Sequence, residues 1–173
     1  TKFGDAGIGR NQSPYAFTKA TNSDLVKNFG AWFDLNYAIV YFYNAYGKRE
    51  ISNGKYATLI GIYKENTIKN DPLKIVLPGT QKRNFTHIDD ITSALEIVAK
   101  KGKGDGFGIG SDRAYTVREI AEMFGGAIEM LPERPGNRMS AKLHTEKIVA
   151  LGWKPKYQII DYIDEIRKNN WKI

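Results

Sequence analysis

The stretch NYAIVYFY, from Asn36 to Tyr43, determines the class of fold. Its residues are β-branched or aromatic almost throughout and hardly alternate with polar ones, which is typical of a strand covered on both faces, as in a parallel sheet. Before it, Pro14 can occupy the first turn of a helix that extends to about Trp32. Because helices and strands continue to alternate downstream, the sequence predicts an α/β domain.

The rest of the chain alternates between turn-forming, strand-like and helical stretches, without an internal repeat. Thr116 and Glu119 precede an apolar run at the spacing of a capping box, which marks the start of a helix. From such signals we expect helices at 14–32, 56–69, 89–101 (capped by Asp89), 116–124, 145–151 and 159–169, strands at 36–43, 74–77, 84–88, 106–109 and 127–131, and a loop at 44–55.

The composition is that of a folded domain. Of the 173 residues, 42% are hydrophobic and 12% aromatic, which is enough apolar material for a core. The absence of cysteine excludes a disulfide framework, a thiolate metal site and a cysteine nucleophile, and makes a cytoplasmic location the default expectation. The longest mostly apolar stretch, Tyr37 to Tyr43, is far too short for a membrane span, and the first residues lack a secretory pattern.

The charge balance indicates anionic ligands, since 26 Lys and Arg against 19 Asp and Glu leave a net charge of +7. The basic residues are dispersed and no recognised motif frames them, so we do not expect nucleic-acid binding. The glycine-rich run from Gly102 to Gly110 has neither the dinucleotide-binding nor the P-loop spacing, and we interpret it as a turn before a strand. We expect His87 to pack at a strand end and His144 to lie at the surface, so no metal site is expected.

A tyrosine and a lysine stand four residues apart near the start of the first predicted helix. In YAFTK, Tyr15 and Lys19 would lie on one face of that helix. A cation beside a phenol stabilises the phenolate and lowers the pKa of the phenol, which makes the phenol a usable base near neutral pH. About one such pair arises by chance in a chain of this composition, so the pair gains weight only from its surroundings.

Those surroundings consist of five segments in a fixed order. They are Ser13–Lys19 (SPYAFTK), Tyr43–Arg49 (YNAYGKR), Gly79–Asp90 (GTQKRNFTHIDD), Pro132–Asn137 (PERPGN) and Leu151–Pro155 (LGWKP). Together they resemble the extended short-chain dehydrogenase/reductase family, that is, the NAD-dependent sugar-nucleotide epimerases and dehydratases of the UDP-glucose 4-epimerase type. The resemblance extends over nearly the whole chain.

The resemblance implies an enzyme with NAD as its cofactor. Tyr15 takes the place of the family's catalytic acid/base. Lys19 takes the place of the lysine that binds the nicotinamide ribose and lowers the tyrosine pKa. Phe42 stands where an aromatic side chain lines the nicotinamide pocket.

The resemblance also implies a nucleotide-diphosphate sugar as substrate. Asn44, Arg83 and Arg134 match residues that contact the diphosphate, and planar guanidinium groups suit this role because they bind phosphate oxygens through paired hydrogen bonds. The other implied substrate contacts are Lys74, Ile75 and Val76, whose segment recognises the base through its backbone, Thr58 and Leu59 in the substrate domain, and Asn137 where the family often has an aspartate that holds a ribose.

The chain also departs from the family pattern. Lys48 replaces the proline of Gly-Pro-Arg, and Asn84 replaces the aspartate of Arg-Asp-Phe. The Gly-rich turn of the family's NAD-binding half, and the acidic residue that follows it, are absent. We therefore expect the C-terminal part of a Rossmann-like doubly wound parallel sheet plus a small α/β substrate-binding domain, and an inactive isolated chain.

The expected division of the chain follows from this alignment. The remainder of the NAD-binding domain would comprise 1–50 and 80–112, with the catalytic helix at 14–32, and the substrate-binding domain would comprise 51–79 and 113–173. Homodimers that form through the helix with Tyr15 and Lys19 are possible, although core packing in a monomer explains its apolar residues equally well.

The predicted activity is epimerisation of a nucleotide-diphosphate sugar through a transient keto-sugar. Thr1 occupies a position that usually holds a catalytic glutamate in the family's 4,6-dehydratases, which favours an epimerase. A nucleotide-sugar 4,6-dehydratase and a non-catalytic sugar-nucleotide-binding module stay open as alternatives.

Overall fold

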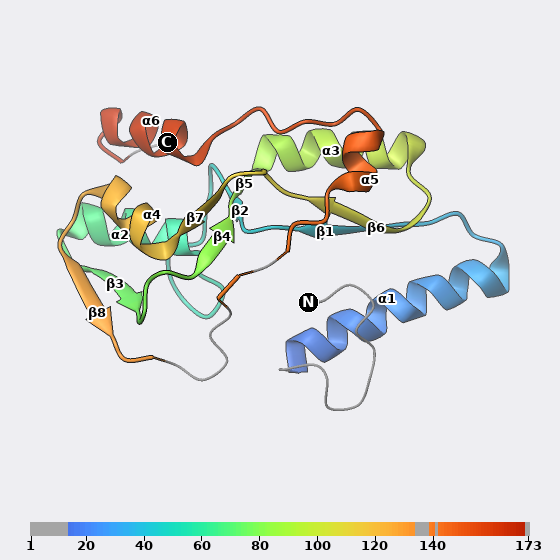
Figure 1. Ribbon diagram of the computed structural model, residues 1–173, viewed down its shortest axis with the longest axis horizontal. Coiled ribbons are helices and arrows are strands. Elements are labelled where there is room, and N and C mark those ends of the chain that lie inside the picture. Colours follow the sequence, from blue (N-terminus) through green and yellow to red (C-terminus); the bar gives the residue numbers. More distant parts are fainter. Residues whose placement is uncertain (1–13, 134–138, 141, 172–173) are drawn as a thin grey trace.

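Helices and strands alternate along the chain in the computed structural model, which describes residues 14–133, 139–140 and 142–171 (Figure 1). The helices are α1 (Pro14–Phe33), α2 (Leu59–Lys69), α3 (Ile88–Lys101), α4 (Val117–Phe124), α5 (Glu146–Ala150) and α6 (Ile159–Lys168). The strands are β1 (Ala38–Phe42), β2 (Ala45–Tyr46), β3 (Leu73–Val76), β4 (Lys82–Asn84), β5 (Thr86–His87), β6 (Gly104–Ile109), β7 (Ala114–Thr116) and β8 (Ile128–Leu131).

Most strand pairs are parallel. β1 pairs with β6, β2 with β5 and β3 with β8 in parallel, whereas β4 and β7 are antiparallel. In the β1–β6 pair, Val40 lies opposite Phe107 and Phe42 opposite Ile109. This pairing confirms that the apolar stretch around β1 belongs to a parallel sheet, and the whole arrangement confirms the α/β class.

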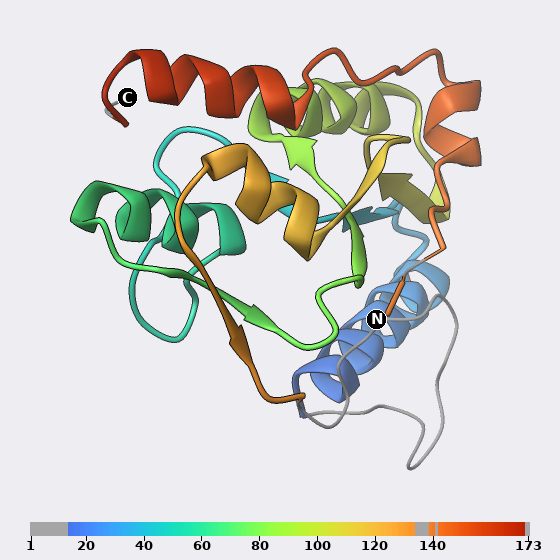
Figure 2. The same cartoon turned by 60° about the vertical axis from the view of Figure 1, so that its left-hand side comes forward.

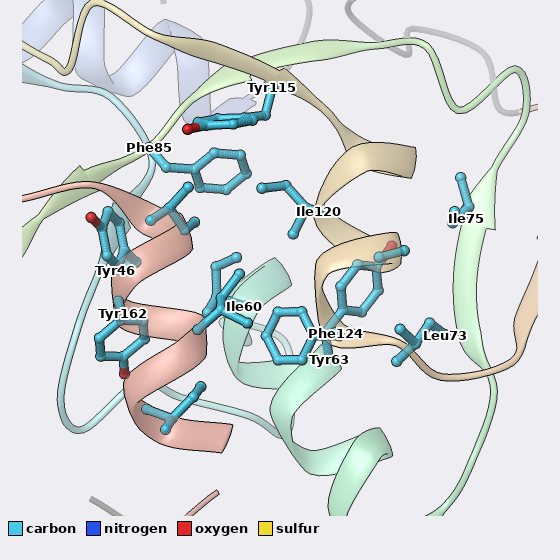
Figure 3. Close-up of a cluster of buried hydrophobic side chains, with 14 residues drawn as sticks. Tyr46, Ile60, Tyr63, Leu73, Ile75, Phe85, Tyr115, Ile120, Phe124 and Tyr162 are labelled. Carbon is cyan, nitrogen blue, oxygen red and sulfur yellow. The ribbon is translucent and has the colours of Figure 1, made fainter. Parts of the chain in front are cut away.

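Two hydrophobic cores hold the described residues together. The first core lies between α2, α4, α6 and the strand β3 (Figure 3), and it comprises Tyr46, Ile60, Tyr63, Leu73, Ile75, Phe85, Tyr115, Ile120, Ala121, Phe124, Ile159, Tyr162, Ile163 and Ile166. The second core joins the β1–β6 pair to α3 and α5, and it comprises Ile91, Ala94, Val98, Phe107, Ile109, Ile148 and Trp153.

Asp90 connects the two cores. Its buried carboxylate accepts hydrogen bonds from the backbone N–H groups of Lys156 (2.9 Å) and Tyr157 (3.0 Å), and its carbonyl accepts one from Nε1 of Trp153 (3.1 Å). Trp153 belongs to the second core, and the segment after it leads into α6 of the first core. Asp90 therefore fixes the path of the chain between the cores.

α1 is the longest helix and lies apart from α2, α4 and α6 in both views of the molecule (Figures 1 and 2). None of its 20 residues is buried. In the part of the chain that the structure describes, no helix combines the length and the apolar character that crossing a bilayer requires.

Some element boundaries differ from the sequence-based expectation. α2 begins at Leu59, not at residue 56, because the Thr58 hydroxyl caps it by accepting a hydrogen bond from the Gly61 N–H (3.0 Å). The prediction of Asp89 as the cap of α3 was wrong: His87 is the N-cap, and its Nδ1 accepts a hydrogen bond from the Asp89 N–H (3.2 Å). The single strand expected at 84–88 is divided between β4 and β5, because these pair with different partners.

Candidate active site

The N-terminal turns of α1 present the predicted tyrosine and lysine together. Pro14 opens the described helix, and the Thr18 hydroxyl donates back to the Pro14 carbonyl (2.9 Å). Nζ of Lys19 lies 5.7 Å from the centroid of the Tyr15 ring, and Tyr15 is 69% exposed. The helical spacing thus places a phenol and an ammonium group side by side, open to a ligand.

The C-terminal end of β1 carries the next two predicted residues. Phe42 is the last residue of the strand and is 53% exposed, so it offers a flat apolar surface. Asn44 follows with φ of 31°, in the left-handed region that asparagine tolerates better than most side chains. Its Nδ2 donates to the Asn84 carbonyl (2.8 Å), and its own carbonyl accepts from the Thr86 N–H (3.1 Å). These contacts hold the sharp turn after β1, and among the described residues only one of the two Asn44 amide protons has a hydrogen-bond partner.

Arg83 lies beside this turn. It occupies the middle of β4 opposite Tyr115, is partly exposed, and donates from Nη1 to the Lys82 carbonyl (2.8 Å). Because Asn44 contacts the backbone of the next residue, Asn84, the structure brings Asn44 next to the strand that carries Arg83, although 39 positions separate the two residues in the sequence. An amide at the turn and a guanidinium group on the adjacent strand are both groups that can donate hydrogen bonds to an anion.

Asn84 explains one departure from the family pattern. It is buried, and its Nδ2 donates to the Ser111 carbonyl (2.9 Å). An ionised aspartate has no proton to donate to that carbonyl, so it would leave the buried acceptor unpaired. The asparagine therefore fits the neutral surroundings of this position.

Lys74, Ile75 and Val76 lie on β3, which pairs with β8. Ile75 is fully buried in the first core, backbone included, so it is not open to a ligand in this structure. Nε2 of Gln81 donates to the Val76 carbonyl (2.8 Å), which joins this strand to the segment that carries Arg83. The Lys74 side chain is exposed and forms a long ion pair with Glu129 (3.9 Å).

Of the other residues predicted to contact the substrate, two are engaged in contacts within the protein and two lie outside the described residues. The Thr58 hydroxyl is occupied in capping α2, and Leu59 packs against the first core. Arg134 and Asn137 lie outside the described residues. Among the residues that the structure describes, no group of three or more His, Cys, Asp or Glu side chains is arranged to hold a metal ion.

Tyr43 makes a long-range contact that was not predicted from the sequence. Its hydroxyl donates to the Lys142 carbonyl (3.1 Å) and accepts from the His144 N–H (3.1 Å). The tyrosine thereby ties residues 142–144 to the turn that carries Asn44. Nothing in the sequence distinguishes Tyr43 from the other aromatic residues of its strand, because the partners are about 100 residues away.

Glu50 is a buried titratable group in the loop after β2. Burial raises its pKa to about 7, and a hydrogen bond from the Gly47 N–H to Oε1 (2.8 Å) and the charge of Lys64 only partly offset this. Its Oε2 is buried without a hydrogen-bond partner among the described residues. The carboxyl group also contributes to the raised pKa of Tyr162 in α6, so it faces the first core.

Comparisons with known proteins show what the chain and its fold resemble. Residues 4–110, more than half of the chain, match the model of the NAD-dependent epimerase/dehydratase family. The UDP-glucose 4-epimerase of Thermotoga maritima, solved with UDP-glucose, is 26% identical and superimposes with a TM-score of 0.82, covering 91% of this chain and 54% of that chain. The UDP-glucose 4-epimerase of Thermus thermophilus, solved with NAD, is 25% identical with a TM-score of 0.77, covering 88% and 52%.

A dehydratase is similarly close in sequence. The dTDP-D-glucose 4,6-dehydratase of Bos taurus is 26% identical over 193 residues, covering 99% of this chain and 53% of the relative. The chain thus spans about half the length of the curated relatives it matches.

Proposed function

Because the chain belongs to the NAD-dependent epimerase/dehydratase family, we propose that it provides the catalytic tyrosine and the sugar-nucleotide contacts of a nucleotide-diphosphate-sugar epimerase. One observation carries the proposal: Nζ of Lys19 lies 5.7 Å from the ring centroid of an exposed tyrosine, Tyr15, on one face of α1. A cation on the same helix face as a phenol can stabilise the phenolate, and this supports proton transfer by Tyr15.

The residues present fit the nicotinamide end of NAD. Tyr15 and Lys19 offer exposed polar groups for the ribose, and Phe42 offers an exposed aromatic face for the ring. NAD, when bound, supplies the acceptance and return of a hydride. The protein's own part is to orient the cofactor and to move the proton.

In the proposed reaction, Tyr15 removes the proton from a sugar hydroxyl, most simply the one on C4, as that carbon becomes a ketone. Lys19 holds positive charge beside the phenolate. The keto-sugar then rotates in the site so that its other face meets the cofactor. The hydride returns to the same carbon on that opposite face, and Tyr15 returns the proton to the oxygen. The result is inversion at one carbon with no net oxidation.

The diphosphate would stay in place while the sugar turns. Asn44, in the turn after β1, and Arg83, on the adjacent strand β4, would supply an amide and a guanidinium donor for the phosphate oxygens, and Arg134 is proposed as the second arginine. The proposed base contacts come from the backbone of Lys74 and Val76, with Thr58, Leu59 and Asn137 as further contacts. Binding energy from this remote part of the substrate serves to position the reacting carbon.

The decisive experiment uses the natural polypeptide that contains these residues. Tyr15→Phe removes the hydroxyl and is expected to lower kcat about 10³-fold, because general acid/base catalysis contributes about 10²- to 10⁴-fold. The matched control is Tyr56→Phe, another exposed tyrosine, which should leave turnover unchanged. Near wild-type turnover in Tyr15→Phe would refute the assignment.

Two other functions have specific support. The likeness to the bovine dehydratase favours a 4,6-dehydratase, and product analysis by NMR separates the two because a dehydratase forms a 4-keto-6-deoxy sugar. A non-catalytic sugar-nucleotide-binding module is the second alternative, and the proposed substrate contacts Asn44 and Arg83 would serve it equally. It predicts that calorimetry of the 173-residue chain detects a UDP-sugar but not NAD.

We also propose that residues 1–50 and 80–112 belong to the NAD-binding unit, residues 51–79 and 113–173 belong to the substrate-binding unit, and two copies associate through α1. The exposed apolar side chains of α1 support this association, and sedimentation equilibrium of the chain tests it.

A further inference from the structure

The glycine-rich run from Gly102 to Gly110, which fits no phosphate-binding pattern, has a structural use in β6. Gly104 and Gly106 adopt φ angles of 76° and 99°, a region that favours glycine, and Asp105 stands between them. The register of β1 and β6 shifts here: Ala38 lies opposite Gly104 but Val40 lies opposite Phe107. Two residues of β6, Asp105 and Gly106, therefore oppose one residue of β1, which is a β-bulge, a feature that redirects side chains.

The redirected carboxylate of Asp105 binds two side chains. Oδ2 lies 2.6 Å from Nζ of Lys27, and Oδ1 accepts a hydrogen bond from the Tyr41 hydroxyl (2.9 Å). The Asp105 carbonyl also accepts from Nζ of Lys147. Partial burial opposes ionisation of Asp105, but the hydrogen bonds from Lys27 and Tyr41 outweigh it and hold the pKa of that carboxyl below its usual value. Lys27, in turn, has a raised pKa because of its hydrogen bond to Asp105.

These contacts matter because α1 has little apolar burial to fix it within the described residues, its small residues Ala16, Ala20 and Gly30 being only half-buried. No residue of this helix is buried. Besides Lys27, Ser23 in the middle of α1 also contacts the sheet, through a side-chain hydrogen bond with Tyr41. An isolated exposed ion pair contributes little to stability, but here one carboxylate joins a helix and two strands through both of its oxygens.

We propose that Asp105 is a positioning residue that sets the tilt of α1 against the β1–β6 pair, and thereby the place of Tyr15 and Lys19. Its catalytic consequence rests on the proposed function, whereas its effect on the helix does not. Tyr15 lies about 18 Å along the helix axis from Lys27 at about 1.5 Å per residue. A tilt of about 10° at Lys27 would displace Tyr15 by about 3 Å, enough to disrupt a reacting geometry.

The helix position can be measured without any assay of activity. Because the chain has no cysteine, Thr18→Cys on α1 and Lys101→Cys on α3 provide two specific sites for spin labels. Pulsed dipolar spectroscopy should give a narrow distance distribution in the parent chain. Asp105→Asn and Lys27→Met should each broaden the distance distribution or shift it by several ångström. Lys27→Arg keeps a cation at this position and should give the distribution of the parent chain.

The matched control is Glu96→Gln, which removes an exposed ion pair to Lys100 on α3 and should leave the distribution unchanged. If Asp105→Asn does not fold, Lys27→Met carries the test, since its side chain lies at the surface end of the same ion pair. A distribution in Lys27→Met identical to that of the parent would overturn the proposal.

Kinetics on the natural polypeptide then test the consequence for catalysis. Lys27→Met should lower kcat about tenfold with little change in KM for the nucleotide sugar, and Lys27→Arg should recover most of kcat. A fall in kcat without any change in the label distance would also overturn the positioning role. If the enzyme proves to catalyse no sugar-nucleotide reaction, the proposed function fails while the distance measurement still decides the role of Asp105.

Discussion

The helices α1 and α6 use their apolar residues in opposite ways. In α6, four of ten residues are buried, namely Ile159, Tyr162, Ile163 and Ile166, and all four belong to the first core. In α1, none of the 20 residues is buried, and Trp32 and Phe33 are 64% and 61% exposed. The first core therefore closes on itself within the described residues, whereas α1 has no fully buried residue, carries half-buried small residues such as Ala20 and Gly30, and contacts the sheet through the ion pair of Lys27.

Apolar residues at helical spacing therefore have two different meanings in this chain: burial in a core for α6 and an exposed surface for α1. The apolar spacing of α6 is satisfied by its neighbours α2 and α4, as Figure 3 shows for Tyr162, Ile60 and Ile120. The apolar residues of α1 form an exposed surface of the kind that marks an interaction site on a monomer. Three changes can test how far the contrast extends.

The largest expected effect is that of truncating a core residue of α6. Ile163→Ala should lower the free energy of unfolding by about 3 kcal/mol, because it removes buried methyl groups and leaves a cavity. The matched change on α1, Leu25→Ala, should cost less than about 0.5 kcal/mol. Urea unfolding of both variants gives the two values. Equal costs would contradict the contrast between the helices.

A smaller effect concerns Glu50, which faces α6 at the edge of the first core. Because its pKa rises from 4.5 to about 7 on folding, the folded state holds a proton that the unfolded state releases, and stability falls as pH increases through this window. The fall attributable to this group is about 3 kcal/mol between about pH 4.5 and pH 8. Glu50→Gln keeps an acceptor for the Gly47 N–H and should lack this fall in parallel unfolding curves. A pH dependence identical to that of the parent would show that Glu50 titrates normally.

The smallest expected effect on folding comes from the exposed end of α1. The double substitution Trp32→Ser with Phe33→Ser should change the free energy of unfolding of the monomer by less than about 0.5 kcal/mol. If two copies associate through α1, the same substitutions should raise the dissociation constant at least tenfold, roughly 1.4 kcal/mol, in sedimentation equilibrium. Unchanged association would place the contact elsewhere.

The sequence predicted best those features that depend on neighbours along the chain. The capping box of Thr116 and Glu119 forms as expected, with the Glu119 N–H donating to the Thr116 hydroxyl (3.0 Å) and the Thr116 N–H to the Glu119 carboxylate (2.6 Å). The pairing of Tyr15 with Lys19 follows from helical spacing in the same way. These features are local, so periodicity and spacing contain the information that they require.

Features that depend on distant partners were not predictable from the sequence alone. The two-residue strand β2 lies inside a predicted loop, because only its pairing with β5 makes it a strand. His87 rather than Asp89 caps α3, since the imidazole is held beside Tyr46 and Tyr157 from other parts of the chain. In the candidate site, the approach of Asn44 to Asn84 and the bond between Asp105 and Lys27 both join residues that lie at least 40 positions apart.

The position of Asp90 has a consequence for cooperativity. The hydrogen bonds that its carboxylate accepts from Lys156 and Tyr157 restrain the segment between Trp153 and α6. Detaching α6 from the first core would strain these bonds, and opening the second core would free Trp153 and remove their support. One buried carboxylate at the start of α3 thus links two hydrophobic cores, and we expect them to unfold in a single transition rather than in two.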